Sequence, residues 1–276
     1  MDLPGMHLTS IYLYPVKSLR GCAVSRARVD VLGFEGDRRL MIVDETGKAI
    51  TQREMPRMAL IDTMIVDDRV VLAMGGKGSI EVNVNSDPAA QTRSVQIWRS
   101  SGLLAEDCGE DAAQWLGGIL ATRCRLVRVG ARFHRPVGEG ERNDSVAFVD
   151  AYPGLILGEA SLADLNDRLC VRSEEPVTVT HFRPNLVFTG SGAYAEDGWI
   201  RSRIGDVVFR SCGPCARCSV TTIDVATGER RLEPLRTLAN YRRNPVNSAE
   251  VVFGQNLMNE TKSGMVRVGN PIIVLA

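Results

Sequence analysis

The residues with the most chemistry available to them are three cysteines spaced three apart, Cys212, Cys215 and Cys218. Thiolates act as redox couples, as nucleophiles and as ligands of soft metals. Four interpretations compete: a disulfide or redox-active pair, a zinc or iron–sulfur site, a single thiolate ligand of a metal cofactor, and a surface turn with incidental cysteines. The surrounding residues have to decide among them.

The stretch Cys212-Gly213-Pro214-Cys215 has the residues of a thioredoxin-type redox pair. Such a pair needs a helix directly after it, because the helix N-terminus stabilises the thiolate. Here residues 219–225, SVTTIDV, are rich in β-branched side chains and predict a strand. The chain has seven cysteines, an odd number, which also disfavours a disulfide framework. The thiol-redox interpretation predicts a disulfide between Cys212 and Cys215.

A metal site made of protein ligands alone lacks a fourth ligand in this stretch. Structural zinc takes four ligands, and the nearest of the three histidines is His181. An iron–sulfur run would need cysteine at position 222, where Thr222 stands. One thiolate is enough if a cofactor brings the other ligands, and Arg217 beside Cys218 would favour the ionised form.

The elements that must position these residues are mostly strands. Short apolar runs that alternate or are rich in β-branched residues dominate the chain. Helical patterns occur only at 107–121, 159–169 and 233–243, and they do not alternate with strands. We therefore expect a mainly β (α+β) protein with barrel-like antiparallel or mixed sheets and a few attached helices.

Local signals refine this expectation. Ser161 and Asp164 form a predicted capping pair, and Pro234 is the predicted first residue of the third helix. The stretch 44–47 predicts a hairpin turn, and the Gly-, Arg- and Glu-rich stretch 130–145 predicts a long exposed loop. A boundary near residue 122 would divide the chain into domains 1–122 and 123–276.

Composition disfavours several classes of partner. Lysine plus arginine is 33 and aspartate plus glutamate is 33, so no net charge attracts nucleic acid or an anionic membrane. No stretch approaches the ~20 apolar residues of a membrane span, and the N-terminus lacks a signal peptide pattern. We expect a soluble, cytoplasmic protein that takes a small-molecule substrate, with neither a nucleic acid nor a membrane as partner.

Ten separated segments match one known family in the same order over nearly the whole chain. They include PVKSLRG (15–21), GDRRLMIVDETG (36–47), LILGEASLADLN (155–166), FRPNLVF (182–188), CARCSVTTIDVATG (215–228) and VFGQN (252–256). Together they resemble the MOSC superfamily, in particular the branch of the mitochondrial amidoxime-reducing component and its bacterial homologues. The resemblance implies an N-terminal MOSC β-barrel-type domain followed by a MOSC β-barrel domain.

The resemblance also implies a cofactor. In that family a molybdenum–pterin group binds at the domain junction, and the metal is held by the pterin dithiolene and the last cysteine of the CxRC element, here Cys218. Asp150 is the second candidate catalytic residue, near the metal. Charged and polar side chains suit the pterin and its phosphate dianion. The positions carried over for this role are Lys17, Ser18, Arg38, Arg183, Asn185, Arg217 and Asn256.

The implied activity is reduction of N-hydroxylated compounds (hydroxylamines, amidoximes, N-hydroxy bases). The chain begins without a membrane anchor and ends without a ferredoxin domain, so electrons would come from a separate donor protein. One departure concerns Ala151 and Tyr152, which stand where the family commonly has hydroxyl residues, so cofactor contacts there would be lost or moved to backbone. The alternative is a molybdenum-cofactor carrier or sulfur-handling protein without turnover.

Overall fold

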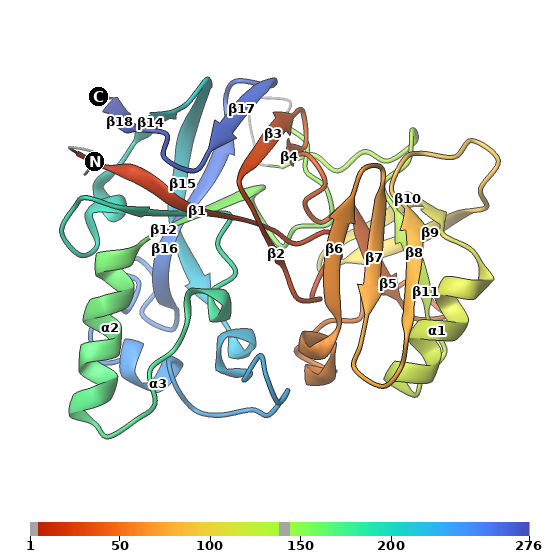
Figure 1. Ribbon diagram of the computed structural model, residues 1–276, viewed down its shortest axis with the longest axis horizontal. Helices are drawn as coiled ribbons and strands as arrows, with labels where there is room; N and C mark the ends of the chain where they lie inside the picture. Colours follow the sequence, from red (N-terminus) through yellow and green to blue (C-terminus); the bar gives the residue numbers. More distant parts are fainter. Residues whose placement is uncertain (1–4, 138–143, 276) are drawn as a thin grey trace.

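The computed structural model describes residues 5–137 and 144–275. Figure 1 shows two lobes side by side, one with the longest sheet, α2 and α3, the other with β5 to β11 and α1. Most elements are strands, so the predicted mainly β class is confirmed. No helix in the described ranges has the length and apolar character needed to cross a membrane.

The first lobe is built on an eight-stranded mixed sheet. Its strands in spatial order are β18 (Ile272–Leu275), β14 (Arg201–Ile204), β15 (Val207–Arg217), β16 (Val251–Asn259), β12 (Gly154–Gly158), β13 (Leu186–Thr189), β1 (His7–Leu13) and β2 (Cys22–Val24). Only β12 and β13 pair in parallel among them. A three-stranded sheet shares its apolar core and consists of β17 (Gly264–Arg267), β3 (Arg26–Asp30) and β4 (Gly33–Phe34).

The second lobe contains two smaller antiparallel sheets. One has the order β5 (Leu40–Val43), β11 (Arg125–Arg128), β10 (Ser100–Asp107) and β9 (Thr92–Ile97), and the other β6 (Asp62–Val66), β7 (Arg69–Ala73) and β8 (Ser79–Asn83). The pairings among described strands give each sheet two edge strands and close none into a complete ring. Strands β1 to β4 belong to the first lobe, so the chain crosses between lobes before residue 40. The boundary near 122 stays a prediction.

The three helices occur where the sequence indicates them, with corrected ends. Helix α1 (Glu110–Leu120) packs Leu116 and Leu120 into the core of the second lobe. Helix α2 (Glu159–Val171) lies against the large sheet, and α3 covers only Leu235–Leu238. Short 3-10 helices lie at Pro56–Leu60, Val179–His181, Ala195–Gly198 and Ser219–Thr222.

Two predicted helix caps are wrong. The residue before α2 is Gly158, and Ser161 lies inside the helix, where its hydroxyl donates to the buried carboxylate of Glu196 at 2.9 Å. The hydroxyl oxygen accepts from the Tyr194 amide at 2.8 Å, so tertiary partners have replaced the local amide donor expected of a cap. Pro234 precedes α3 instead of being its first residue.

The two turn predictions had different outcomes. The turn at 44–47 is confirmed, because Asp44 Oδ1 accepts from the Thr46 and Lys48 amides and Gly47 adopts φ 86°. The exposed loop predicted at 130–145 lies partly outside the described residues. Inside them it is wrong for Phe133 and Arg135, which are buried.

The buried carboxylate of Asp107 stabilises the second lobe and makes the stability of this lobe depend on pH in acid. Asp107 accepts from Arg125 at 2.6 Å, from Arg93, and from the Gly109 amide at 2.8 Å. Burial opposes the charge, but these donors outweigh burial and lower the pKa of Asp107. Its stabilisation is therefore full above the unfolded value of about 3.9 and is lost as the pH falls through the lower folded pKa.

We expect Asp107→Asn to lower the free energy of unfolding by about 2 kcal/mol at pH 7, because two guanidinium groups lose their charged acceptor. Urea unfolding between pH 7 and pH 2 measures this. The variant should lose less stability than the wild type on acidification, because the titrating group is gone. Identical acid limbs for both proteins would contradict the assignment.

Candidate functional site

A cavity of about 530 Å³ is lined by residues of both lobes. All nine residues that the sequence nominated line it, namely Lys17, Ser18, Arg38, Asp150, Arg183, Asn185, Arg217, Cys218 and Asn256. They come from positions 17 to 256, so only the fold brings them together. Ala151 and Tyr152, the departures from the family pattern, line it as well.

Two N-terminal segments run side by side and form one wall. The Lys17 amide donates to the Leu40 carbonyl and the Arg38 amide to the Tyr14 carbonyl, both at 2.8 Å. The buried carboxylate of Asp37 accepts from the Tyr14 amide at 2.8 Å and pairs with Arg38 at 2.5 Å. These bonds fix the Lys17 and Arg38 backbones relative to each other.

The segment after the 3-10 helix Val179–His181 joins this wall to the large sheet. Arg38 donates to Asn185 Oδ1 at 3.1 Å and to the Arg183 carbonyl at 3.3 Å. The Asn185 side chain donates to the Tyr12 carbonyl at 3.1 Å. The guanidinium groups of Arg38 and Arg183 lie 4.3 Å and 4.2 Å from the centre of the Tyr14 ring. One aromatic ring thus supports two cations.

Backbone strain is concentrated around this cavity. Eight described residues other than glycine have positive φ, and four of them line it: Ser18 (67°), Arg38 (48°), Trp98 (51°) and Arg183 (54°). Such conformations cost roughly 1–3 kcal/mol each and persist where the surroundings hold them. Strain of this kind gathers at functional sites, which supports the cavity as the site of this protein.

The cysteines lie on and just after β15. The pairing of β15 with β16 shifts register twice between Ser211 and Ala216, and Gly213 adopts φ 89°. Bulges of this kind re-aim side chains. A 3-10 helix, Ser219–Thr222, follows Cys218, so the strand predicted at 219–225 is wrong. The hydroxyls of Thr221 and Thr222 donate to backbone carbonyls three residues earlier, which favours the turn over the strand.

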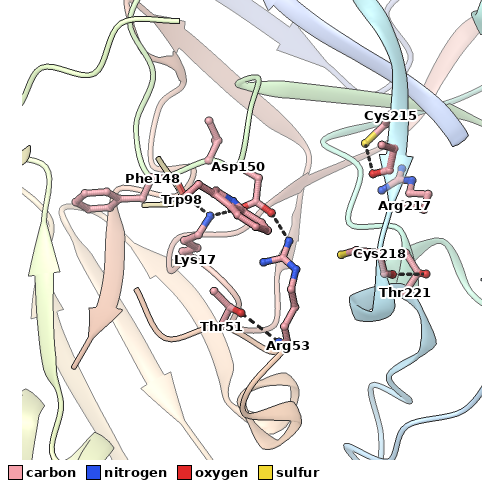
Figure 2. Close-up of polar contacts among 12 residues, drawn as sticks. Lys17, Thr51, Arg53, Trp98, Phe148, Asp150, Cys215, Arg217, Cys218 and Thr221 are labelled. Carbon is pink, nitrogen blue, oxygen red and sulfur yellow. Dashed lines mark hydrogen bonds and ion pairs between the residues drawn. The ribbon is translucent and has the colours of Figure 1, made fainter. Parts of the chain in front are cut away.

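The seven cysteines are all free thiols, so the disulfide predicted by the thiol-redox interpretation is not formed. In the described ranges no three His, Cys, Asp or Glu side chains gather as a metal cluster. Burial raises the pKa of Cys215. The Cys218 thiol instead points into the cavity toward the side on which the Arg53 guanidinium lies (Figure 2).

Asp150 is the centre of the polar cluster in Figure 2. Its carboxylate accepts from Lys17, from Arg53 at 2.7 Å and from the Trp98 indole at 3.0 Å. Lys17 also donates to the Phe148 carbonyl at 2.9 Å, and Arg135 donates to the Asp150 carbonyl at 3.1 Å. Asp150 therefore orients donors from three separate segments toward the cavity.

Burial and charge act against each other in this cluster. Burial would raise the pKa of Asp150, but Lys17 and Arg53 outweigh it and hold that pKa well below its usual range. Burial lowers the pKa of Lys17 to about 8, although Asp150 opposes the shift, so the ammonium is still mostly charged at pH 7. Burial and the neighbouring Arg38 lower the pKa of Arg183 to about 10.

The cavity fits an anionic group. Its lining contains four arginines, one lysine that is mostly protonated at pH 7, and one carboxylate. They are Arg38, Arg53, Arg183, Arg217, Lys17 and Asp150. Within the described chain, Arg183 forms no ion pair and Arg217 Nη2 is buried without a hydrogen-bond partner. Buried cations are normally paired, so an anionic partner is expected here.

A second cavity of about 460 Å³ shares Arg183, His181 and Val220 with the first and is also lined by Tyr14, Arg20 and Gln52. Together the two cavities offer room for an extended ligand. Three thiols line the larger one: Cys212, which accepts from the Arg210 guanidinium at 3.3 Å, Cys215, and Cys218, which lies on the side of Arg53. The residues present therefore fit a pterin phosphate with a metal that carries its own sulfur ligands.

Sequence reasoning missed Arg53 and Trp98. Arg53 lies within a turn closed by Thr51 and Glu54, and its guanidinium lies 4.4 Å from the Trp98 ring centre. Trp98 sits in the two-residue connection between β9 and β10. The only available signal was a large aromatic residue at a hairpin turn, a position that favours glycine or asparagine.

The comparisons with known proteins identify the family of the chain. Residues 5–123 match the model described as the MOSC N-terminal beta barrel domain, and residues 143–273 match the MOSC domain. The chain is 38% identical to mitochondrial amidoxime-reducing component 1 of Mus musculus over 97% of this chain and 82% of that protein. It is 35% identical to the Homo sapiens protein of the same name over the same shares.

A more distant relative is the molybdenum cofactor sulfurase of Danio rerio, 28% identical over 96% of this chain and 34% of that protein. The match to two consecutive MOSC domains and the identity to the amidoxime-reducing components both span nearly the whole chain. The chain therefore belongs to the MOSC family that includes the mitochondrial amidoxime-reducing components.

Proposed function

We propose that the protein is a molybdenum-dependent reductase that converts N-hydroxylated compounds to the corresponding amines or amidines. The observation that carries the proposal is the cavity itself, in which a cation-rich lining and the Cys218 thiol meet at the junction of the two lobes. The names of the relatives, amidoxime-reducing components, support the choice of substrate class.

When bound, a molybdenum–pterin group supplies two-electron redox chemistry, and the net reaction combines an N-hydroxyl compound, two electrons and two protons into an amine and water. The chain supplies the remaining functions. The Cys218 thiolate would be the protein ligand of the metal. Arg38, Arg183 and Arg217 would neutralise the cofactor's anionic groups, with Ser18, Asn185 and Asn256 as polar contacts.

Asp150 acts through the donors that it holds. By pairing with Lys17 and Arg53 it fixes an ammonium and a guanidinium at the cavity wall on the side that Cys218 faces. Lys17 Nζ is a charged donor there, able to hold a proton or a hydrogen bond to a substrate oxygen. Ala151 has no side-chain hydrogen-bond donor, so only its backbone could form polar contacts with the cofactor.

The electron donor belongs to the same proposal. We propose a separate ferredoxin-, flavoprotein- or cytochrome-type protein, and the word component in the relatives' names is consistent with a system of several proteins. The cytoplasmic location expected from the sequence stays a prediction.

The test supplies molybdenum-loaded protein with a strong artificial reductant and with benzamidoxime or an N-hydroxylated nucleobase, and measures the amidine or amine formed. Turnover that requires bound molybdenum is the expected result. Retained cofactor with no turnover of any N-hydroxylated compound would overturn the reductase and favour the carrier alternative.

A further inference from the structure

Trp98 is an exposed aromatic side chain placed at the rim of the cavity. Its relative exposure is 57%, whereas Trp199 is buried and Trp115 is partly buried with its indole bonded to the Lys77 carbonyl. Trp98 lines the same cavity as Cys218 and Asp150. Large exposed aromatic surface beside a cavity is typical of ligand contact.

The backbone conformation at position 98 does not favour tryptophan. The two-residue connection from Ile97 to Ser100 places Trp98 at φ 51°, where glycine or asparagine would be favoured. A bulky residue in that region is a genuine outlier. A strained conformation of this kind is usually retained because it serves a function, and Trp98 lines the cavity.

The indole is held in one orientation before any ligand arrives. Its Nε1–H donates to Asp150 Oδ1 at 3.0 Å, and Arg53 covers it with a guanidinium 4.4 Å from the ring centre. Asp150 and Arg53 are themselves paired at 2.7 Å. A rigid ring loses little conformational entropy on binding, so it is an efficient stacking surface.

The ring is also close to the reactive end of the cavity. The Arg53 guanidinium lies 4.4 Å from the Trp98 ring centre and on the side of the cavity toward which Cys218 points. A ligand stacked on Trp98 would lie in the cavity that Cys218 also lines. Figure 2 shows Arg53 between the Asp150 cluster and Cys218.

We propose that Trp98 determines specificity, as a stacking platform that selects N-hydroxylated substrates whose reacting group is attached to a planar conjugated ring. This inference rests on the proposed function. Aromatic amidoximes and N-hydroxylated heterocyclic bases would be preferred over compounds of the same size and reacting group that carry a saturated ring.

The test compares benzamidoxime with cyclohexanecarboxamidoxime, which differ in the ring and share the reacting group. The wild type should favour benzamidoxime in kcat/KM. Trp98→Leu should reduce the ratio about 2- to 10-fold, the range for an aromatic pair beyond its area burial. Trp98→Phe should keep most of the preference. Molybdenum content and melting temperature, measured on each protein, should match the wild type.

A second readout does not require turnover. Without reductant, benzamidoxime should quench the tryptophan fluorescence of the molybdenum-loaded wild type and leave that of Trp98→Phe, which keeps Trp115 and Trp199, nearly unchanged. An unchanged kcat/KM ratio in Trp98→Leu, or equal quenching in both proteins, would contradict the stacking role of Trp98. Neither result would contradict the proposed reductase activity. If the wild type reduces neither compound, the proposed function fails, and the quenching comparison alone decides the platform.

Discussion

Cys218→Ser lowers the rate of N-hydroxyl reduction more than about 100-fold, because loss of a ligand exceeds the 10- to 100-fold effect typical of residues that only support ligands. Serine keeps the shape of the side chain but replaces a soft thiolate with a hard, weakly acidic hydroxyl. Steady-state rates with an artificial reductant measure the loss. Cys218 lies directly after β15 and lines the cavity, so the substitution is not expected to change the fold.

Two other cysteines provide the controls. Cys170→Ser, on the exposed surface of α2, should stay within about 2-fold of the wild type, as surface substitutions do. Cys215→Ser tests the competing ligand, since Cys215 lines the same cavity with a pKa raised by burial. A loss in Cys215→Ser as large as in Cys218→Ser, or a fully active Cys218→Ser, would contradict the assignment.

Arg183→Met separates cofactor binding from stability. Arg183 is a partly buried cation that forms no ion pair in the described chain and lines both cavities. We expect cofactor affinity to fall about 30-fold or more, the effect of losing one partner of a buried charged contact. The cofactor-free protein should be as stable as the wild type or up to about 2 kcal/mol more stable, because a partly buried charge without an ion-pair partner is removed.

Arg38→Met is the matched control. It also removes a cation from the cavity, but it leaves the buried Asp37 carboxylate without its partner at 2.5 Å. The cofactor-free variant should therefore lose about 3 kcal/mol. Molybdenum retained after dialysis and urea unfolding of the cofactor-free proteins measure both quantities. If Arg183→Met destabilises the cofactor-free protein as much as Arg38→Met does, Arg183 has a structural role and the proposed anion site is wrong.

Much of the site could be predicted because its residues lie in short segments with specific composition. Each of these segments resembles the corresponding segment of the family. They contain Lys17 and Ser18, Arg38, Arg183 and Asn185, and Cys218, and the fold brings all six residues to one cavity. Their roles as cofactor ligands stay predictions, which the substitutions above test.

The remaining contributors depend on tertiary contacts that no local pattern reveals. Arg53 and Trp98 reach the cavity only because the β9–β10 hairpin and the turn after Ile50 converge on Asp150. The strand predicted at 219–225 fails because threonine hydroxyls cap a 3-10 turn there. Ser161 does not cap the helix because its hydroxyl donates to the carboxylate of Glu196, 35 residues away in the sequence.

The most direct test of the central claim is the molybdenum and pterin content of the wild type and of Cys218→Ala, both expressed with molybdate, by elemental analysis and fluorescence of the oxidised pterin. We expect about one molybdenum and one pterin per wild-type chain, with the metal lost or easily removed in Cys218→Ala. Zinc or iron alone in the wild type, or equal and equally stable molybdenum in both proteins, would contradict a cofactor held by Cys218.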